Sequence, residues 1–163
     1  MIVYHGGTNI VQQPLVGVGR KELDFGQGFY LTDILEQANA WASRIAGRRM
    51  EDAIVNSYEL DIEAVSMKYR YKKFDGYNSD WLHFIADNRH GREAWKQYDI
   101  IEGGVADDRV VDTVEQFIAD LISEEKALER LMHYAPNNQI CITNQRLVDE
   151  SLSYIESLTI KTE

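Results

Sequence analysis

Hydrophobic and polar positions divide the chain into short apolar runs and longer stripes of helical spacing. Strands are predicted where short apolar runs lie next to glycines or polar turns, at residues 2–4, 29–31, 55–62, 98–101, 139–143 and 151–160. A helix is predicted after Asp33, because the apolar residues Ile34, Leu35, Ala38, Trp41, Ala42 and Ile45 fall on one face. Asp33 is the expected N-cap of this helix, since Glu36 follows three residues later.

The second half of the chain carries the clearest helical stripe. It comprises Val110, Val111, Val114, Phe117, Ile118, Leu121 and Ile122, and a further helix is predicted through Leu128, Leu131 and Met132, ending before Pro136. A short helix around residues 81–85 interrupts an otherwise irregular stretch at 63–97, residues 9–24 are predicted to form a loop, and a polar turn or short helix precedes residue 151. Strands and helices mix without strict alternation, and no repeat or linker divides them. We therefore expect one α+β domain over residues 1–163.

Composition indicates a globular chain without membrane or disulfide chemistry. Its 44% hydrophobic content over 163 residues is enough for a buried core, and the apolar runs are too short to span a bilayer. No basic segment followed by an apolar stretch opens the sequence, so we expect a cytoplasmic protein. Cys141 is the single cysteine, which rules out an internal disulfide. His83, His90 and His133 lack metal-ligand spacing, so no metal site is expected.

The net charge restricts the kind of partner. With 27 acidic and 17 basic residues the formal charge is −10, and such a surface repels phosphate backbones at long range. A local basic group at Arg44, Arg48 and Arg49 is the exception. It is either a groove for an anion or a solvated helix end that the helix dipole favours. Non-specific nucleic-acid binding is therefore disfavoured.

Three short segments carry candidate chemistry. The first is Tyr-His-Gly-Gly-Thr at residues 4–8, at the end of the first predicted strand. The second is Phe-Gly-Gln-Gly-Phe-Tyr-Leu-Thr-Asp at residues 25–33, and the third is Asn-Gln-Ile-Cys-Ile at residues 138–142. None of them is a Rossmann or P-loop pattern, since GxGxxG and GxxxxGK are absent.

Together these segments resemble the ADP-ribosyltransferase superfamily, particularly its diphtheria-toxin and poly(ADP-ribose) polymerase branch. That branch has, in the same order, a His-Gly pair followed by serine or threonine, a Phe-Gly-Lys-Gly-Ile-Tyr-Phe-Ala-Asp segment and an Asn-Glu pair that opens a strand. The compact length and the Tyr-Asp-x-x-x-Gly-x-Val-Ala-Asp-Asp stretch at residues 98–108 resemble small uncharacterised bacterial domains of this superfamily, some of which are toxins encoded beside small partner proteins. The resemblance implies a split, mixed β-sheet core with flanking helices.

The resemblance also implies a site for NAD. The residues that would bind NAD are His5, Gly6, Gly7, Thr8, Gly28, Phe29, Tyr30 and Trp41, and the catalytic residues would be His5, Tyr30 and Gln139. In such a site Gly6 offers its N–H and C=O to the carboxamide of NAD. His5 binds a ribose hydroxyl, and Tyr30 and Trp41 clamp the nicotinamide ring between aromatic faces.

Two positions depart from the polymerase pattern. Ala38 replaces a serine that bonds the carboxamide, and Gln139 stands where the family has its catalytic glutamate. A glutamine amide can hydrogen-bond the ribose 2′-hydroxyl, but it cannot accept a proton or supply negative charge. Glu102, Asp107 and Asp108 are candidate replacements for the missing acid.

Each feature also has a purely structural interpretation. His5-Gly6 would be an ordinary turn at a strand end, and the Gly-x-Gly-Phe-Tyr segment a tight turn before a core strand. Trp41 would be a buried residue on the apolar face of its helix, and residues 107–109 a helix cap.

The leading expectation is an NAD-dependent mono-ADP-ribosyltransferase that acts on a macromolecular acceptor, as a toxin or phage-defence effector does. A catalytically silent module that binds NAD or ADP-ribose, favoured by Gln139, is one alternative, and an NAD glycohydrolase is another. Residues 63–97 are expected to recognise the acceptor, because irregular exposed segments commonly carry specificity. A toxin would also have a small neutralising antitoxin protein as its partner, docked over the 9–24 loop.

Overall fold

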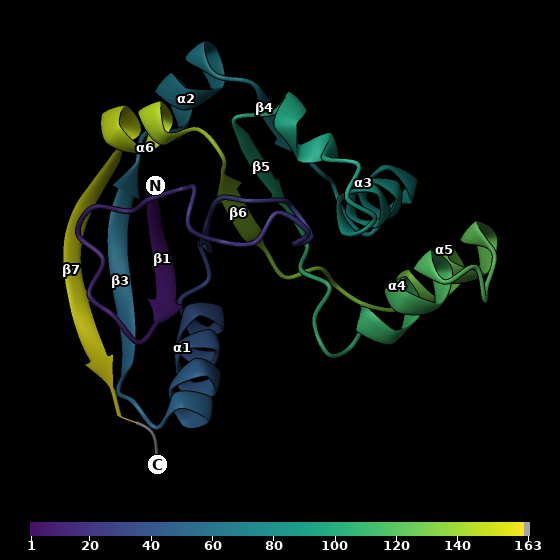
Figure 1. The fold of residues 1–163 in the computed structure, drawn as a ribbon, viewed down its shortest axis with the longest axis horizontal. Coiled ribbons are helices and arrows are strands. Elements are labelled where there is room, and N and C mark those ends of the chain that lie inside the picture. Colours follow the sequence, from purple (N-terminus) through teal and green to yellow (C-terminus); the bar gives the residue numbers. More distant parts are fainter. Residues whose placement is uncertain (162–163) are drawn as a thin grey trace.

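The computed structural model describes residues 1–161 and contains two β-sheets surrounded by helices (Figure 1). The first sheet has the antiparallel order β1-β3-β7, formed by β1 (Ile2–Gly7), β3 (Ala53–Leu60) and β7 (Leu152–Ile160). The second has the order β2-β6-β5-β4, formed by β2 (Phe29–Leu31), β6 (Gln139–Ile142), β5 (Ile100–Gly103) and β4 (Tyr71–Lys73), and its β4–β5 pair is parallel. A single bridge between Tyr4 and Thr32 connects β1 with the end of β2. The predicted α+β class is confirmed.

The helices divide between the two sheets. α1 (Leu35–Arg49) packs on the first sheet through its buried residues Ala38, Ala42 and Ala46. α3 (Ser79–Arg89), the short 3-10 helix η1 (Ala94–Gln97), α4 (Val111–Ile118) and α5 (Glu124–Leu131) lie on the side of the second sheet away from the first (Figure 1). α2 (Ile62–Lys68) and α6 (Gln145–Ser151) contact each other near one end of the two sheets.

The core is divided by the second sheet. Side chains alternate between the two faces of a strand, and on β6 this sends Ile140 and Ile142 into the cluster shared with Val3 and Tyr58 of the first sheet. Cys141 points the other way, into the cluster that the second sheet forms with α3, η1, α4 and α5. Tyr30 packs against this second cluster. The two faces of the second sheet therefore belong to different cores.

Several predicted strand limits are wrong. β1 continues to Gly7, so the His-Gly-Gly segment lies within the strand and does not form the turn that was expected. The run predicted as a strand to residue 62 ends at Leu60, because the Asp61 side chain accepts a hydrogen bond from the Ala64 N–H at 3.1 Å and begins α2. β5 begins at Ile100 and runs two residues past the predicted end.

The helices also depart from their predictions in detail. The N-cap of α1 is Ile34, without a side-chain hydrogen bond, because the carboxylate of Asp33 accepts from Asn138 at 2.9 Å instead. The stripe predicted as one helix to residue 122 ends at Ile118, and Leu121 is 74% exposed in the turn that follows. None of the helices formed by residues 1–161 is long and apolar enough to cross a membrane.

The stretch at residues 63–97 was predicted to be irregular apart from a short helix, but it is mostly regular. It contains most of α2 and all of β4, α3 and η1. Trp81 and Trp95 of this stretch, which was expected to be exposed and to recognise the acceptor, are buried in the core against the second sheet. Burial removes these two aromatic side chains from any contact with an acceptor.

Candidate functional site

The junction of β1 and β2 holds the first candidate residue, His5. Its Nδ1 lies 2.8 Å from the carbonyl oxygen of Tyr30, and its ring stacks on Phe29 with the centroids 4.5 Å apart. Since a carbonyl only accepts hydrogen bonds, we assign the proton to Nδ1, which leaves Nε2 as an acceptor. Burial lowers the pKa of His5 below its ordinary value, against a smaller opposing effect of the Tyr30 carbonyl. His5 is therefore neutral at neutral pH and held in one orientation.

Gly6 is required by the packing of α1 against β1. A Cβ at this position would lie 2.2 Å from the carbonyl oxygen of Ala38 and 3.0 Å from the amide nitrogen of Ala42. Both are backbone atoms of α1, so no side-chain rotation could make room. The sequence pattern gave no indication of this requirement, which is independent of any ligand.

The backbone of Gly6 also faces the gap between the two sheets. Successive residues of an antiparallel strand direct their peptide groups to opposite edges, and Tyr4 pairs its N–H and C=O with Thr32 of the second sheet. Gly6, two residues later, therefore directs its N–H and C=O to the same edge. In the described chain the β1–β2 pairing is limited to that one bridge, and the Tyr30 carbonyl opposite Gly6 binds His5 instead. Gly6 thus presents a donor and an acceptor where the sheets separate.

A cavity of about 210 Å³ adjoins this part of β1. It is lined by His5, Gly6, Gly7, Thr8, Asn9, Val11, Ile45 and Arg49. The structure therefore brings the whole His-Gly-Gly-Thr segment onto one concave surface. Of the basic group Arg44, Arg48 and Arg49, it is Arg49 that lies on this cavity. Sequence reasoning grouped the three without distinguishing them, because only the pairing of β1 with α1 selects one.

The glycines of the 25–33 segment are explained by packing. Gly26 has φ +83°, and a Cβ there would lie 1.9 Å from the ring of Trp95. A Cβ at Gly28 would lie 2.5 Å from the carbonyl oxygen of Ile142 and 2.6 Å from the sulfur of Cys141. These glycines let η1 and β6 approach the segment, so they set the position of β2 in the second sheet.

Tyr30 is held by the segment that precedes it. Its hydroxyl donates to the carbonyl oxygen of Gly26 at 2.6 Å and accepts from the Phe25 N–H at 3.2 Å. Burial raises the pKa of Tyr30 far above its usual range, so the phenol stays protonated. Phe29, which was predicted to contact NAD, is 7% exposed and lies in the core beneath His5. Phe29 supports His5, and the half-buried ring of Tyr30 is fixed in place.

Gln139 opens β6 and shares a sheet face with Tyr30. Tyr30 lies opposite Cys141 on β6, and Gln139 is two residues before Cys141, so their side chains point to the same side. Gln139 is 4% exposed. Its Nε2 lies 3.5 Å from the carbonyl oxygen of Gly104, a separation at the outer limit for a hydrogen bond. The position expected for the catalytic acid is therefore buried and weakly held.

Glu102 does not share the face of Gln139. It lies opposite Ile140 on β6, which places it on the other side of the second sheet. Its carboxylate accepts hydrogen bonds from the Tyr71 hydroxyl and from Nδ2 of Asn138, the latter at 2.9 Å. Glu102 is thus a buried structural carboxylate with a hydrogen-bond partner on each oxygen, and it lies on the sheet face of Phe29 and His5, opposite to that of Tyr30 and Gln139.

Trp41 lines a second cavity, of about 270 Å³, between α1 and the segment that follows β5. The other lining residues are Gln37, Ala40, Arg44, Val105, Ala106, Asp107, Asp108, Val111 and Asn137. Trp41 is half-buried, so one part of its ring remains available to a ligand. Gln37, Trp41 and Arg44 recur at helical spacing and share one face of α1. The two other remaining candidate acids, Asp107 and Asp108, both belong to this cavity and not to the one at His5.

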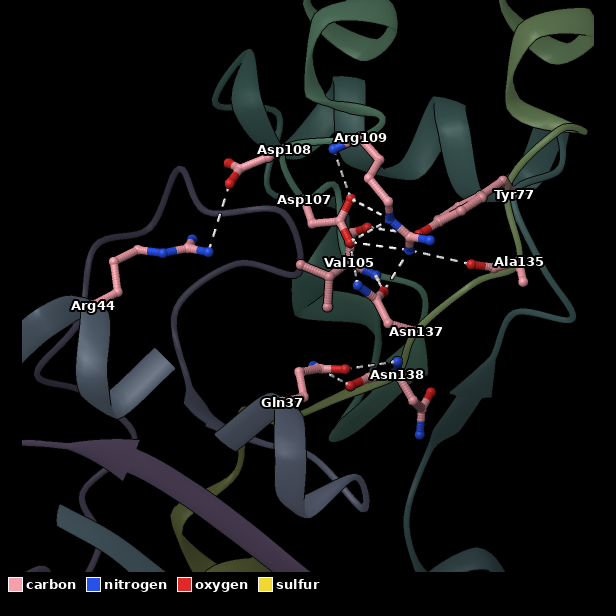
Figure 2. A network of polar contacts seen from close by, with 10 residues as sticks. All are labelled: Gln37, Arg44, Tyr77, Val105, Asp107, Asp108, Arg109, Ala135, Asn137 and Asn138. Carbon is pink, nitrogen blue, oxygen red and sulfur yellow. Dashed lines mark hydrogen bonds and ion pairs between the residues drawn. The ribbon is translucent and has the colours of Figure 1, made fainter. Parts of the chain in front are cut away.

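A polar network holds the wall of this second cavity that faces α1 (Figure 2). The amide of Asn137 accepts from the Val105 N–H at 2.7 Å and donates to Asp107 at 2.6 Å. Arg109 pairs with Asp107 at 3.1 Å. Asp107 was a candidate acid or a helix cap in the sequence, and Asn137 was missed, because the contacts of Asn137 join segments about thirty positions apart.

Two contacts connect α1 to this wall (Figure 2). Gln37 donates to the carbonyl oxygen of Asn138 at 2.6 Å and accepts from the Asn138 N–H at 3.2 Å. Arg44 reaches Asp108 at 3.6 Å, where both side chains are exposed and water screens their attraction. The Gln37 contact is therefore the firm connection, and it sets the distance between Trp41 and the start of β6.

The structure defines the chain as an α+β protein with His5 and Gly6 at the junction of its two sheets, a cavity along residues 5–8 and a separate cavity at Trp41. Residues 1–154 match the family described as a protein of unknown function (DUF3990), and the chain belongs to that family. No curated protein and no solved structure matches the chain. Within residues 1–161 no cluster of three or more histidine, cysteine, aspartate or glutamate side chains is arranged to hold a metal ion.

Proposed function

We propose that this chain is an NAD-dependent mono-ADP-ribosyltransferase whose two sheets form the split core of that superfamily. The observation that carries the proposal is the edge at Gly6. Here the bridge between β1 and the end of β2 stops, and the Gly6 N–H and C=O, unpaired on this edge among residues 1–161, lie next to a neutral, oriented histidine and a cavity. A flat carboxamide needs this combination of one donor and one acceptor on a rigid strand.

The remaining residues supply roles that the transfer of ADP-ribose requires. Nicotinamide leaves the ribose through an oxocarbenium-like state, so the enzyme must hold the ring and the ribose rigidly. The Nε2 acceptor of His5 would bind a ribose hydroxyl, and the fixed ring of Tyr30 would bound the nicotinamide on one side. Trp41 lines the second cavity and not the one at His5, so it is left out of this proposed contact.

Gln139 limits the chemistry that this site can perform. It lies on the sheet face of Tyr30, where its amide would hydrogen-bond the ribose 2′-hydroxyl. It supplies neither a base nor a negative charge, so elongation to a polymer is not proposed. A single transfer to a macromolecular acceptor remains the proposed reaction.

A catalytically silent module that binds NAD or ADP-ribose is the second candidate, and Gln139 favours it. Gln139 is 4% exposed and has one long contact, at 3.5 Å, and no carboxylate hydrogen-bonds its side chain among residues 1–161. The candidate replacement acids lie on the other face of the sheet or on the second cavity.

As a toxin, the protein would need a neutralising antitoxin, and the loop at residues 9–24 is the proposed contact. This loop carries exposed apolar side chains at Ile10 (62%), Leu15 (57%) and Val18 (78%). Exposed apolar residues of this kind are typical of surfaces that bind another protein.

The proposal is tested with NAD labelled in its ADP-ribose half, incubated with the pure protein and a cell lysate. Release of nicotinamide with label on a macromolecule would establish a transferase. Release with free ADP-ribose alone would establish a glycohydrolase, and binding of NAD without release would establish the silent module. Absence of NAD binding in calorimetry would overturn the proposal.

Gln139→Glu is expected to raise the rate of nicotinamide release by about 10- to 100-fold, because it restores one transition-state stabiliser. Gln97→Glu is the matched control, since residue 97 is an exposed glutamine at the end of η1 and lies on neither cavity. Thermal unfolding of both variants shows whether the buried carboxylate at 139 is tolerated. An unchanged rate in a folded Gln139→Glu variant would place residue 139 away from the ribose.

A further inference from the structure

Arg49 is a cationic side chain on the His5 cavity without an acidic partner among residues 1–161. The contact that the structure gives its guanidinium is with the Thr8 hydroxyl, at 3.4 Å. Arg44, five residues earlier on α1, is paired with Asp108. In a chain with 27 acidic and 17 basic residues, a cavity-lining arginine left without a carboxylate is available for another anion.

The cavity around Arg49 has the composition of an anion site. None of its described lining residues is acidic, and Thr8 adds a hydroxyl donor. At Gly7 a Cβ would still have room, 3.6 Å from Nε2 of His5, so the absence of a side chain there leaves space that packing does not require. Arginine is the residue best suited to phosphate, because its planar fork offers paired donors.

The cavity is large enough for only part of a ligand. Its volume of about 210 Å³ is below the roughly 300–1,000 Å³ of pockets that enclose whole small molecules. The lining continues from the Gly6 edge to Arg49. A ligand that enters at the edge would therefore extend a second, anionic portion toward the end of α1.

We propose that this cavity is a diphosphate subsite and that Arg49 is its anion-binding residue. The proposal rests on the proposed function in one respect, which is that the diphosphate belongs to NAD, with its nicotinamide end at Gly6. The chemical class recognised is a diphosphate joined to a ribose. Arg49 lies at the rim of this subsite and is exposed. The affinity for a diphosphate is therefore expected to fall as the ionic strength rises.

The test is calorimetric titration of the full chain with NAD, with inorganic pyrophosphate and with nicotinamide riboside, which lacks the diphosphate. Arg49→Gln is expected to weaken the binding of NAD and of pyrophosphate by about 10- to 100-fold, the usual consequence of losing hydrogen bonds to a charged group. The affinity for nicotinamide riboside is expected to stay within twofold. Arg49→Lys should restore part of the affinity, since it returns the charge without the fork.

Arg48→Gln is the matched control, because it removes the same charge from the same turn of α1 at a residue that does not line the cavity. If Arg48→Gln and Arg49→Gln weaken NAD equally, the effect is one of net charge and the subsite is overturned. If the wild-type protein binds NAD and Arg49→Gln binds it as well, the subsite fails and the proposed function stands. If pyrophosphate binds in an Arg49-dependent manner but NAD does not bind, the subsite stands and the proposed function fails.

Discussion

Replacing Gly6 by alanine tests the packing that positions β1 against α1. The added methyl would lie 2.2 Å from the carbonyl oxygen of Ala38 and 3.0 Å from the amide nitrogen of Ala42. Real carbon atoms do not approach an oxygen this closely, so the strand or the helix must move. Because both contacts are with helix backbone, no side-chain rotation relieves them, and β1 and α1 must move apart.

The cost of that shift can be bounded from the usual effects of overpacking. Extra methyl groups in a packed interior destabilise by about 1–3 kcal/mol when side chains can adjust. Since side chains cannot adjust here, we expect the free energy of unfolding to fall by at least about 3 kcal/mol. For a chain of this length that corresponds to a decrease in Tm of roughly 6–12 °C.

Gly7→Ala is the matched control on the next residue of the same strand. Its Cβ would lie 3.6 Å from Nε2 of His5, an ordinary van der Waals contact. We expect it to be neutral or to stabilise by about 0.4–1 kcal/mol, because alanine has fewer unfolded conformations than glycine. Thermal and urea unfolding of both variants measure the difference. Equal stability of the two would refute the close approach of α1 to β1.

Two further predictions concern Tyr30 and Glu150. Tyr30→Phe should lower the free energy of unfolding by about 1–3 kcal/mol, because two backbone groups lose their hydrogen-bond partner. In calorimetry its NAD affinity should stay within twofold of the wild type, because the ring remains. A large loss of affinity would contradict the ring as the contact. Hydrogen bonds from Lys68, Tyr69 and Arg146 lower the pKa of Glu150 from 4.5 to about 2. The folded state therefore binds this proton less readily than the unfolded state, so the contribution of Glu150 is complete above pH ~5 and is lost as the pH falls from 4.5 toward 2. Urea unfolding should show Glu150→Gln less stable than the wild type at pH 7 and the difference shrinking toward pH 2, and a difference independent of pH would refute this.

Elements whose signals are local could be predicted from the sequence. α1 was found because its small apolar residues recur at helical spacing, and β6 because a short apolar run follows a polar turn. β4 could not be found in this way. It has three residues, pairs in parallel with β5 and depends on the carboxylate of Asp99, which binds the Arg70 N–H at 2.8 Å from 29 positions away.

The candidate site shows the same division between local and long-range contacts. His5, Gly6, Gly7 and Thr8 share a cavity because they are consecutive on one strand. Arg49 joins them only through the packing of α1 on β1, and its contact with Thr8 spans 41 positions. The contact of Gln37 with Asn138 spans 101 positions. A single sequence carries no signal for contacts of this kind.

The glycines do not decide between a structural and a functional interpretation of the site. Packing alone accounts for Gly6, Gly26 and Gly28, since a Cβ at each would overlap a neighbouring group. Packing does not require the space beside Gly7, and Arg49 has no carboxylate partner among residues 1–161. Gly7 and Arg49 line one cavity together with a neutral His5. The case for a ligand therefore rests on the cavity, and substitutions at Arg49 test it without disturbing the packed glycines.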